Sequence, residues 1–237
     1  MPALLARLGP IKAPNFRLAR QISNSLHAGY AASHYSVLET CPMVCFCTPE
    51  HALDRTLREF MAQSAIRCTM VVLLGYVRDS CAASALSRAA LRVASVNPVP
   101  GSEGRIFAGE GHPAALRAFR SLLAEDRCKL IELKPGTKPL FFAGLHTLAP
   151  LLLPWLAAGV ECLRASGFPR ARAAEIGELL AVQTVRSFAK SGTKAWNRKM
   201  AADLRHPLEQ EMDAIRKRDP AFAELYEQGI RIALKRF

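Results

Sequence analysis

The side chains that could perform chemistry in this sequence gather in the stretch KPGTKPLFFAGLHT, residues 134–147. Lys138, His146 and Thr147 are polar groups at the head of an otherwise apolar helical pattern, between two halves of the chain, where clefts form. A lysine or histidine there could position or protonate a substrate carbonyl, so Lys138 and His146 are the candidate catalytic residues. The alternative is a lysine that covers the helix start and a histidine satisfied in the core, because neither has a paired acid.

A second candidate site is the stretch LGPIKAPNFRLARQI, residues 8–22. A strand, a tight glycine turn and a helix amino terminus together bind anions, because unpaired backbone N–H groups and the helix dipole point at the ligand. The sequence predicts a strand over 3–8 that ends at Gly9, and a helix that starts near Asn15, a good N-cap residue. This order is typical of the phosphate-binding turn of a dinucleotide-binding fold.

The glycine pattern of such a turn, G-x-G-x-x-G, is incomplete here. Only Gly9 is present, and Pro10 and Pro14 remove two N–H donors. Three basic side chains could bind phosphate in place of the lost donors: Lys12, Arg17 and Arg20. The alternative is a degenerate loop that only connects the strand to the helix.

The residues after the next strands select the cofactor. A second strand is expected around 30–33, and a dinucleotide fold places after it either an acid for a ribose 2′-hydroxyl or basic and hydroxyl groups for a 2′-phosphate. Ser33 and His34 stand there without an acid, so NADP is predicted rather than NAD. Further along, Thr48, Pro49 and Asn97 follow later strands. They could contact a ligand at the carboxyl edge of the sheet, or they could only begin a helix or form a loop. The candidate cofactor-binding residues are Gly9, Pro10, Lys12, Asn15, Arg17, Ser33, His34, Thr48, Pro49 and Asn97.

The elements that must position these residues divide the chain into two parts. Residues 1–133 alternate short apolar runs with helical patterns, which predicts a parallel sheet covered by helices, an α/β fold. Strands are expected over 3–8, 30–33, 43–47, 69–73, 92–96, 105–108 and 129–133, and helices over 49–62, 80–90 and 113–124. Residues 134–237 show no strand, and helical patterns run over 140–165, 171–190 and 208–218. The loop LKPGTKP between the parts is a natural hinge.

Residues 139–160 carry no charge over a length that could span a bilayer. His146, Pro150 and Pro154 favour a buried central helix instead, so no membrane span is expected. No secretory signal opens the sequence, and the protein is expected in the cytoplasm.

The net charge of +12 favours anionic partners, or only keeps the protein in solution. Nucleic acid is a minor alternative, because the basic carboxyl-terminal runs lack interleaved aromatic residues. The seven cysteines form no CxxC pair or zinc spacing, so reduced thiols and no metal are expected. Cys45 and Cys47, on one face of a strand, are expected to pack as small apolar residues.

The order of several motifs resembles the bacterial Rossmann-like proteins whose carboxyl-terminal half is the domain of unknown function 2520. These are distant relatives of pyrroline-5-carboxylate reductases and deazaflavin-linked NADP reductases. The motifs are NFRLARQISNSLHAGY, CTPEHAL, NPV, IFAGEG and above all KPGTKPLFFAG, and the resemblance covers nearly the whole chain.

This resemblance implies an NADP-binding domain over 1–133 and an all-helical, 6-phosphogluconate-dehydrogenase-like domain over 134–237 that forms homodimers. It also implies an oxidoreductase of unknown small-molecule substrate, with hydride transfer between the domains. The sequence departs from the family pattern in its glycine loop and in Phe141-Phe142, where an aromatic-histidine pair is usual. Lys138 carries over, whereas the rest of the catalytic set does not. The second hypothesis is therefore a non-catalytic Rossmann-like binding or scaffold protein.

Overall fold

The computed structural model describes residues 2–62, 70–78, 80, 91–195 and 208–236. The chain forms two compact units, Met1–Leu145 and His146–Phe237. The division falls inside a helix that begins at Lys138. The domain boundary expected from the sequence, at 133/134, stays a prediction.

The strands of the first unit build two sheets. The smaller sheet pairs β1 (Pro10–Lys12) with β2 (Tyr30–Ala32) in parallel. The larger sheet has the order β3-β4-β5-β6-β7. Its strands are β3 (Met43–Phe46), β4 (Met70–Leu74), β5 (Arg92–Pro98), β6 (Ile106–Gly111) and β7 (Lys129–Glu132). The expected α/β fold is thereby confirmed.

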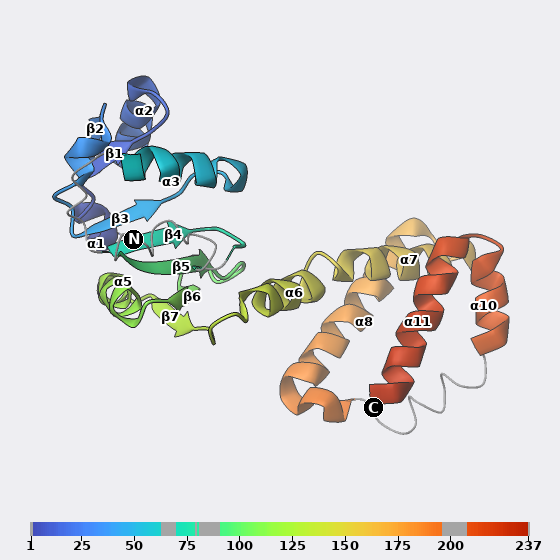
Figure 1. Ribbon diagram of the computed structural model, residues 1–237. Helices are drawn as coiled ribbons and strands as arrows, with labels where there is room; N and C mark the ends of the chain where they lie inside the picture. Colours follow the sequence, from blue (N-terminus) through green and yellow to red (C-terminus); the bar gives the residue numbers. More distant parts are fainter. Residues whose placement is uncertain (1, 63–69, 79, 81–90, 196–207, 237) are drawn as a thin grey trace. The chain divides into compact units, whose positions relative to one another are not determined.

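Alternating side chains of the larger sheet face two separate cores. Val71 and Leu73 of β4 pack with α3 (Leu53–Ala62) on one face. Val72, between them, packs with α5 (Pro113–Glu125) on the other face. This alternation arises because successive strand residues point to opposite faces. Figure 1 shows α3 and α5 on the two sides of the sheet.

One sheet contact is antiparallel, although the sequence predicts a parallel sheet. β5 and β6 are antiparallel neighbours, whereas the other described strand pairs are parallel. The short connection between β5 and β6 explains this, because a parallel partner needs a long crossover. Gly101, Glu103 and Gly104 all have positive φ in this connection, and they allow the tight reversal.

The predicted strand over 3–8 is wrong. The chain instead forms the helix α1 (Pro2–Ala6), and the first strand begins at Pro10. A proline suits the first turn of a helix. The carboxylate of Asp126 also accepts hydrogen bonds from the N–H groups of Ala3 and Leu4, at 2.9 and 3.0 Å. This contact is distant in the sequence, so local patterns could not reveal it.

The remaining elements of the first unit are α2 (Phe16–Leu26), η1 (Tyr35–Leu38) and η2 (Glu50–Ala52). The helix predicted over 80–90 lies outside the described residues except for Ser80.

The described part of the second unit is helical, as predicted. Its elements are the end of α6 (Lys138–Leu148), α7 (Leu152–Ala165), α8 (Arg170–Ser191), η4 (Gly192–Ala195), α10 (Leu208–Arg216) and α11 (Pro220–Arg236). The helix predicted over 140–165 is interrupted at residues 149–151, because Pro150 cannot donate a helical hydrogen bond. The sequence prediction also missed α11.

The expected buried central helix is not observed. In α6 only Lys138 is buried, and α7 has no buried residue. Leu140 and Leu148 expose 72% and 74% of their surface. By length and composition alone, Lys138–Ala165 is apolar enough to cross a membrane, with a mean hydropathy of 1.6.

Candidate functional site

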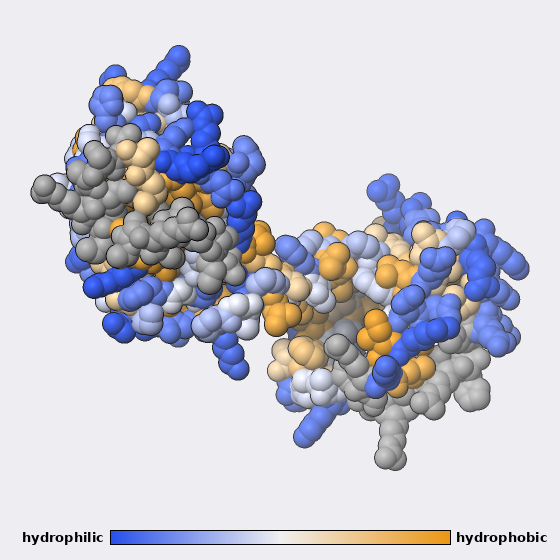
Figure 2. Space-filling model, in the orientation of Figure 1, coloured by the Kyte–Doolittle hydropathy of each residue, from blue (hydrophilic) through white to orange (hydrophobic). Residues whose placement is uncertain are grey.

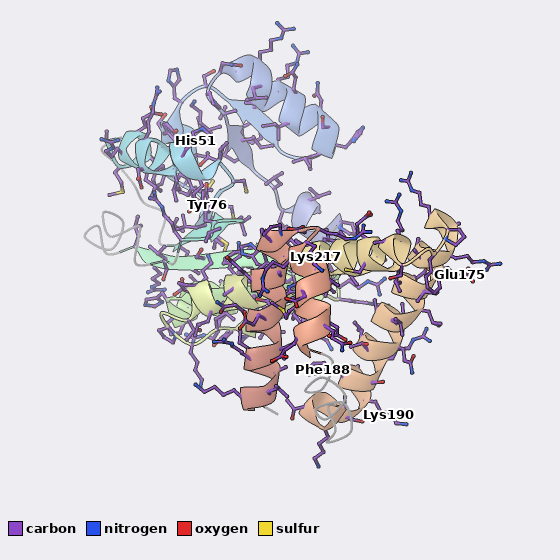
Figure 3. The ribbon with its side chains drawn as sticks, turned by 90° about the vertical axis from the view of Figure 1, so that its right-hand side faces the viewer. His51, Tyr76, Glu175, Phe188, Lys190 and Lys217 are labelled. Atoms are coloured by element: carbon purple, nitrogen blue, oxygen red, sulfur yellow. The ribbon has the colours of Figure 1, made fainter. Side chains whose placement is uncertain are left out.

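Polar side chains from three neighbouring strands meet at the carboxyl edge of the large sheet. Thr48 follows β3, Tyr76 follows β4 and Asn97 lies near the end of β5. The N–H of Thr48 donates to the Tyr76 hydroxyl at 2.8 Å, and Thr48 Oγ1 lies 2.6 Å from the same oxygen. The amide nitrogen of Asn97 donates to the carbonyl of Tyr76 at 3.0 Å. Tyr76, which Figure 3 labels, therefore links the end of β4 to the ends of β3 and β5.

The orientation of the Asn97 amide follows from this contact. The carbonyl of Tyr76 can only accept, so the Asn97 nitrogen must face it and Oδ1 must point away. Asn97 is 4% exposed, and its Oδ1 has no hydrogen-bond partner within the described structure. Buried polar atoms are nearly always paired in folded proteins. Thr48 and Asn97, both predicted as cofactor contacts, thus lie at one edge, and their ligand role stays a prediction.

A second set of contacts ties the loop after β4 to the loop after β3. Glu50 accepts hydrogen bonds from the N–H groups of Val77 and Arg78, at 3.0 and 3.3 Å. The guanidinium of Arg78 donates to both carboxylate oxygens of Asp54 at 3.0 Å. Sequence reasoning missed this network, because its partners lie more than twenty residues apart. Pro49, a predicted cofactor contact, lies exposed beside Glu50.

Lys138 lies beneath this edge with a fully buried side chain, at 0% exposure. Its Nζ donates to the carbonyl of Arg78 at 2.8 Å and to Ser95 Oγ. Ser95 Oγ in turn donates to the same carbonyl at 3.3 Å, so its lone pair is free to accept from the ammonium. The structure therefore places this predicted catalytic residue at the strand edge but below its surface.

Glu110 is a second buried charge in this region, at 2% exposure. Its carboxylate accepts from the N–H of Ser80 at 2.6 Å and from Ser80 Oγ at 3.1 Å. Glu110 on β6 stands opposite Ser95 on β5. The sequence offered no signal for this role beyond an acid inside a strand pattern.

His146, the other predicted catalytic residue, lies on α6 at the start of the second unit. His146 and Thr147 are exposed, unlike Lys138. The catalytic roles of Lys138 and His146 stay predictions.

The turn between β1 and α2 consists of residues 13–15. Asn15 is the N-cap of α2, as predicted, and its side chain accepts from the N–H of Leu18 at 2.8 Å. Pro14 contributes no donor. Gly9 and Pro10 lie at the start of β1, because the strand begins after Gly9 and not before it. The structure thus moves both residues out of the turn in which the sequence placed them.

The basic residues near this turn lie in different surroundings. Lys12 Nζ donates to the carbonyl of Ala13 and lies 5.1 Å from the ring centre of Tyr35. Arg17 and Arg20 are exposed on α2, and in the described residues neither forms an ion pair. These two arginines are therefore the cations that stay available for an anion at this turn.

Ser33 and His34 follow β2 directly and are exposed. No Asp or Glu occurs between residues 8 and 38, which include β1, α2 and β2. The segment that holds β1, α2 and β2 therefore supplies no carboxylate of its own that would bind a ribose 2′-hydroxyl and repel a 2′-phosphate.

The cysteine prediction is wrong in one respect. Cys45 on β3 and Cys47, which follows the strand, are both exposed, so they do not pack in a core. Protein atoms around the sulfur of Cys45 nevertheless desolvate it and, together with Cys47, raise its pKa to about 12. The described residues contain no group of three His, Cys, Asp or Glu side chains that could hold a metal ion.

No protein-family model and no curated protein matches this sequence. Solved structures do match it. The "putative NADP oxidoreductase" of Bacteroides fragilis is 11% identical, with a TM-score of 0.74 over 98% of this chain and 89% of its own. An imine reductase from Myxococcus stipitatus in complex with NADP⁺ is 12% identical, with a TM-score of 0.71 over 99% and 90%. A 1-pyrroline-5-carboxylate reductase from Streptococcus pyogenes is 13% identical, with a TM-score of 0.58 over 95% and 88%.

These likenesses cover nearly all of each chain, so the protein has the fold of these reductases from end to end. They confirm the expected class, a Rossmann-like α/β unit followed by helices. Identities of 11–13% carry the fold and no more.

Proposed function

We propose that the protein is an NADP-dependent oxidoreductase whose first unit binds the dinucleotide along the carboxyl edge of its parallel strands. The observation that carries this proposal is the end of β2, where Ser33 and His34 are exposed and no acid occurs between residues 8 and 38. Ligands of open α/β sheets lie at this edge, and a hydroxyl with basic neighbours suits a 2′-phosphate. The solved reductases that share the fold include one in complex with NADP⁺.

The residues present suit the 2′-phosphate of NADP better than its pyrophosphate. At the 2′-phosphate end, Ser33 and His34 supply a hydroxyl and an imidazole, and Arg17 with Arg20 adds positive charge on α2. At the pyrophosphate, the turn 13–15 has no glycine, so the amino terminus of α2 and its arginines must supply the binding. At the other end of the edge, the buried oxygen of Asn97 is a free acceptor beside Tyr76.

When bound, the nicotinamide group supplies or accepts a hydride. The residues of this chain bind and orient it: Thr48 and Asn97 are held in place by Tyr76, and Glu50 fixes the backbone of the next loop. His146 remains the candidate for proton transfer to a substrate, because it is exposed whereas Lys138 is buried. The substrate is a small molecule whose structure these residues do not define.

A thermal unfolding screen with NADPH, NADP⁺, NADH and inorganic phosphate tests this proposal. A ligand that binds only the folded state at about a hundred times its Kd raises the unfolding midpoint by about 5 °C. We expect this shift with NADPH and NADP⁺ and a smaller one with NADH. A shift with phosphate alone would support the second candidate function, a binding protein without catalysis, which the turn without glycine favours. No shift with any of them would contradict the proposal.

We also propose that the second unit joins two copies of the chain. On α8 the side chains of Leu179, Leu180, Val185 and Phe188 are 54–64% exposed and point to several sides of the helix. Large apolar side chains that gather on an exposed surface mark an interaction site. Figure 2 shows further apolar side chains on this unit, and Figure 3 labels Phe188.

We propose a second copy of the chain as the partner that covers these side chains, because exposed apolar patches mark protein interfaces. Light scattering should give twice the chain mass of 25.9 kDa. Val185→Glu should yield monomers, and Glu175→Gln, at another exposed position of α8, should not. A monomeric wild-type protein would contradict this part of the proposal.

A further inference from the structure

We propose that the second unit binds an apolar chain that ends in a carboxylate, in a groove between α7 and α8. Arg170 binds the carboxylate, and apolar side chains of α7 contact the chain. The groove belongs to the second unit alone, so this inference does not depend on the proposed cofactor.

The groove lies between two helices that pack against each other (Figure 1). Its volume is about 520 Å³, within the range of about 300–1,000 Å³ that is usual for small-molecule sites. α7 lines it with one stripe of side chains, because residues three or four positions apart share a face of a helix. The stripe includes Leu153, Leu156, Ala157, Val160 and Arg164.

The floor of the groove is apolar and partly open to water. Leu153 exposes 64% of its surface, Ala157 is exposed, and Leu156 and Val160 are half-buried. Removing such surface from water is favourable. At 1.5 Å per residue, the stripe from Leu153 to Arg164 is about 16 Å long. An extended apolar chain therefore suits the groove in chemistry and in length.

The charge at the α8 end of the groove is not balanced. The first turn of α8 contains Arg170 and Arg172 but no acid, and Pro169 provides no side-chain cap. The helix dipole is positive at this end, so an anion stabilises the turn whereas added cations do not. Arg172 forms an ion pair with Glu175 at 2.7 Å. Arg170, which lines the groove, forms none with the described residues.

The other two charges of the groove neutralise each other. Arg164 forms an ion pair with Glu161 at 2.7 Å, and both side chains line the groove. One unpaired guanidinium therefore stands beside an apolar floor. A guanidinium forms strong paired hydrogen bonds with a carboxylate or a phosphate. A carboxylate carries one negative charge, which matches Arg170, whereas a phosphate monoester carries nearly two.

The groove is distinct from the surface that we assign to a second copy of the chain. Leu179, Val185 and Phe188 of that surface lie nearer the C-terminal end of α8. Arg170 and Ala174, the α8 residues of the groove, lie in its first two turns. A dimer formed through the later turns thus leaves the groove residues outside its contact.

Calorimetric titration with octanoate tests the proposal, with octanol and acetate as controls. Octanol keeps the apolar chain without the charge, and acetate keeps the carboxylate without the chain. Wild-type protein should bind octanoate at least about tenfold more tightly than either, because both the chain and the carboxylate contribute. Equal affinities for octanoate and octanol, or no binding of octanoate, would overturn the proposal.

Substitution of Arg170 locates the carboxylate. Arg170→Met should weaken octanoate binding at least about tenfold and leave octanol binding unchanged. Arg172→Met is the matched control, because it removes the same charge from the same turn but Arg172 already pairs with Glu175. The control should change the affinity little. Equal effects of the two substitutions would mean that only net charge matters, against the proposal.

Ala157→Phe locates the chain. The new ring fills the groove from an exposed position of α7, so the variant should fold normally and bind neither octanoate nor octanol. Its mass by light scattering should equal that of wild type. A changed mass would show that a second copy occupies the groove, and unchanged octanoate binding would place the ligand elsewhere. Either result would contradict the proposal.

Discussion

The hydroxyl of Tyr76 lies 2.6 Å from Oγ1 of Thr48 and accepts a hydrogen bond from the N–H of the same residue at 2.8 Å. This contact joins the ends of two parallel strands, β3 and β4, at the edge where ligands of such sheets lie. The ring of Tyr76 is buried, so its hydroxyl reaches the edge from below. Thr48 is thus held at the position where we expect the dinucleotide.

Removing this hydroxyl should cost stability without disturbing the core. Tyr76→Phe keeps the buried ring but leaves the Thr48 N–H without its acceptor, so the free energy of unfolding should fall by about 1 kcal/mol or more. Urea unfolding measures the change. Tyr30→Phe is the control, because Tyr30 is 55% exposed and its loss should be negligible. Equal effects of both substitutions would contradict the role of the Thr48 contact.

The same tyrosine predicts a decline of stability in alkaline solution. Burial raises the pKa of Tyr76 above its ordinary value of 10.0, although the hydrogen bonds with Thr48 oppose this shift. A folded-state pKa above the unfolded value stabilises the protein fully below pH 10, and this contribution is lost as the pH rises further. Unfolding followed between pH 8 and 11 should show this loss in wild type and a smaller one in Tyr76→Phe. Identical pH profiles would argue against it.

Gly111, at the end of β6, should tolerate no side chain. Its φ is +126°, and an added Cβ would lie 2.5 Å from the carbonyl oxygen of Val93. Gly111→Ala should therefore destabilise the protein by about 3 kcal/mol. Gly136 also has a positive φ but open space around it, so Gly136→Ala should cost only about 1 kcal/mol. Chemical denaturation of both variants should reproduce this order, and the reverse order would show that strain at β6 is absent.

The cofactor preference should reverse when an acid is placed after β2. Ser33→Asp should weaken NADPH binding at least about tenfold through charge repulsion, and strengthen NADH binding through the ribose hydroxyls. Fluorescence titration with both reduced cofactors measures the ratio. Ser25→Asp adds the same charge at an exposed position of α2 and should change the ratio little. A matching effect of Ser25→Asp would mean that only net charge matters.

Local sequence patterns were enough to locate the strands that have clear apolar runs. β3, β4 and β5 were predicted within about two residues. The three-residue strand β1 was misplaced because it contains Pro10 and follows an apolar helix. The direction of β6 depends on its neighbours in space, which alternation along the sequence does not encode.

The sequence predicted some of the residues at the candidate site, but not how their side chains contact one another. Thr48 and Asn97 were predicted to lie at strand ends, and the structure confirms that position. The burial of Lys138 could not be inferred, because it depends on Arg78 and Ser95, which are 60 and 43 residues away. Tyr76 was missed because an aromatic residue after a strand usually signals core packing alone.

The most direct test of the account is calorimetric titration of the wild-type protein with NADPH and with NADH. The account predicts saturable binding of NADPH at one site per chain, with an affinity at least about tenfold higher than that for NADH. Absence of NADPH binding, or tighter binding of NADH, would contradict it.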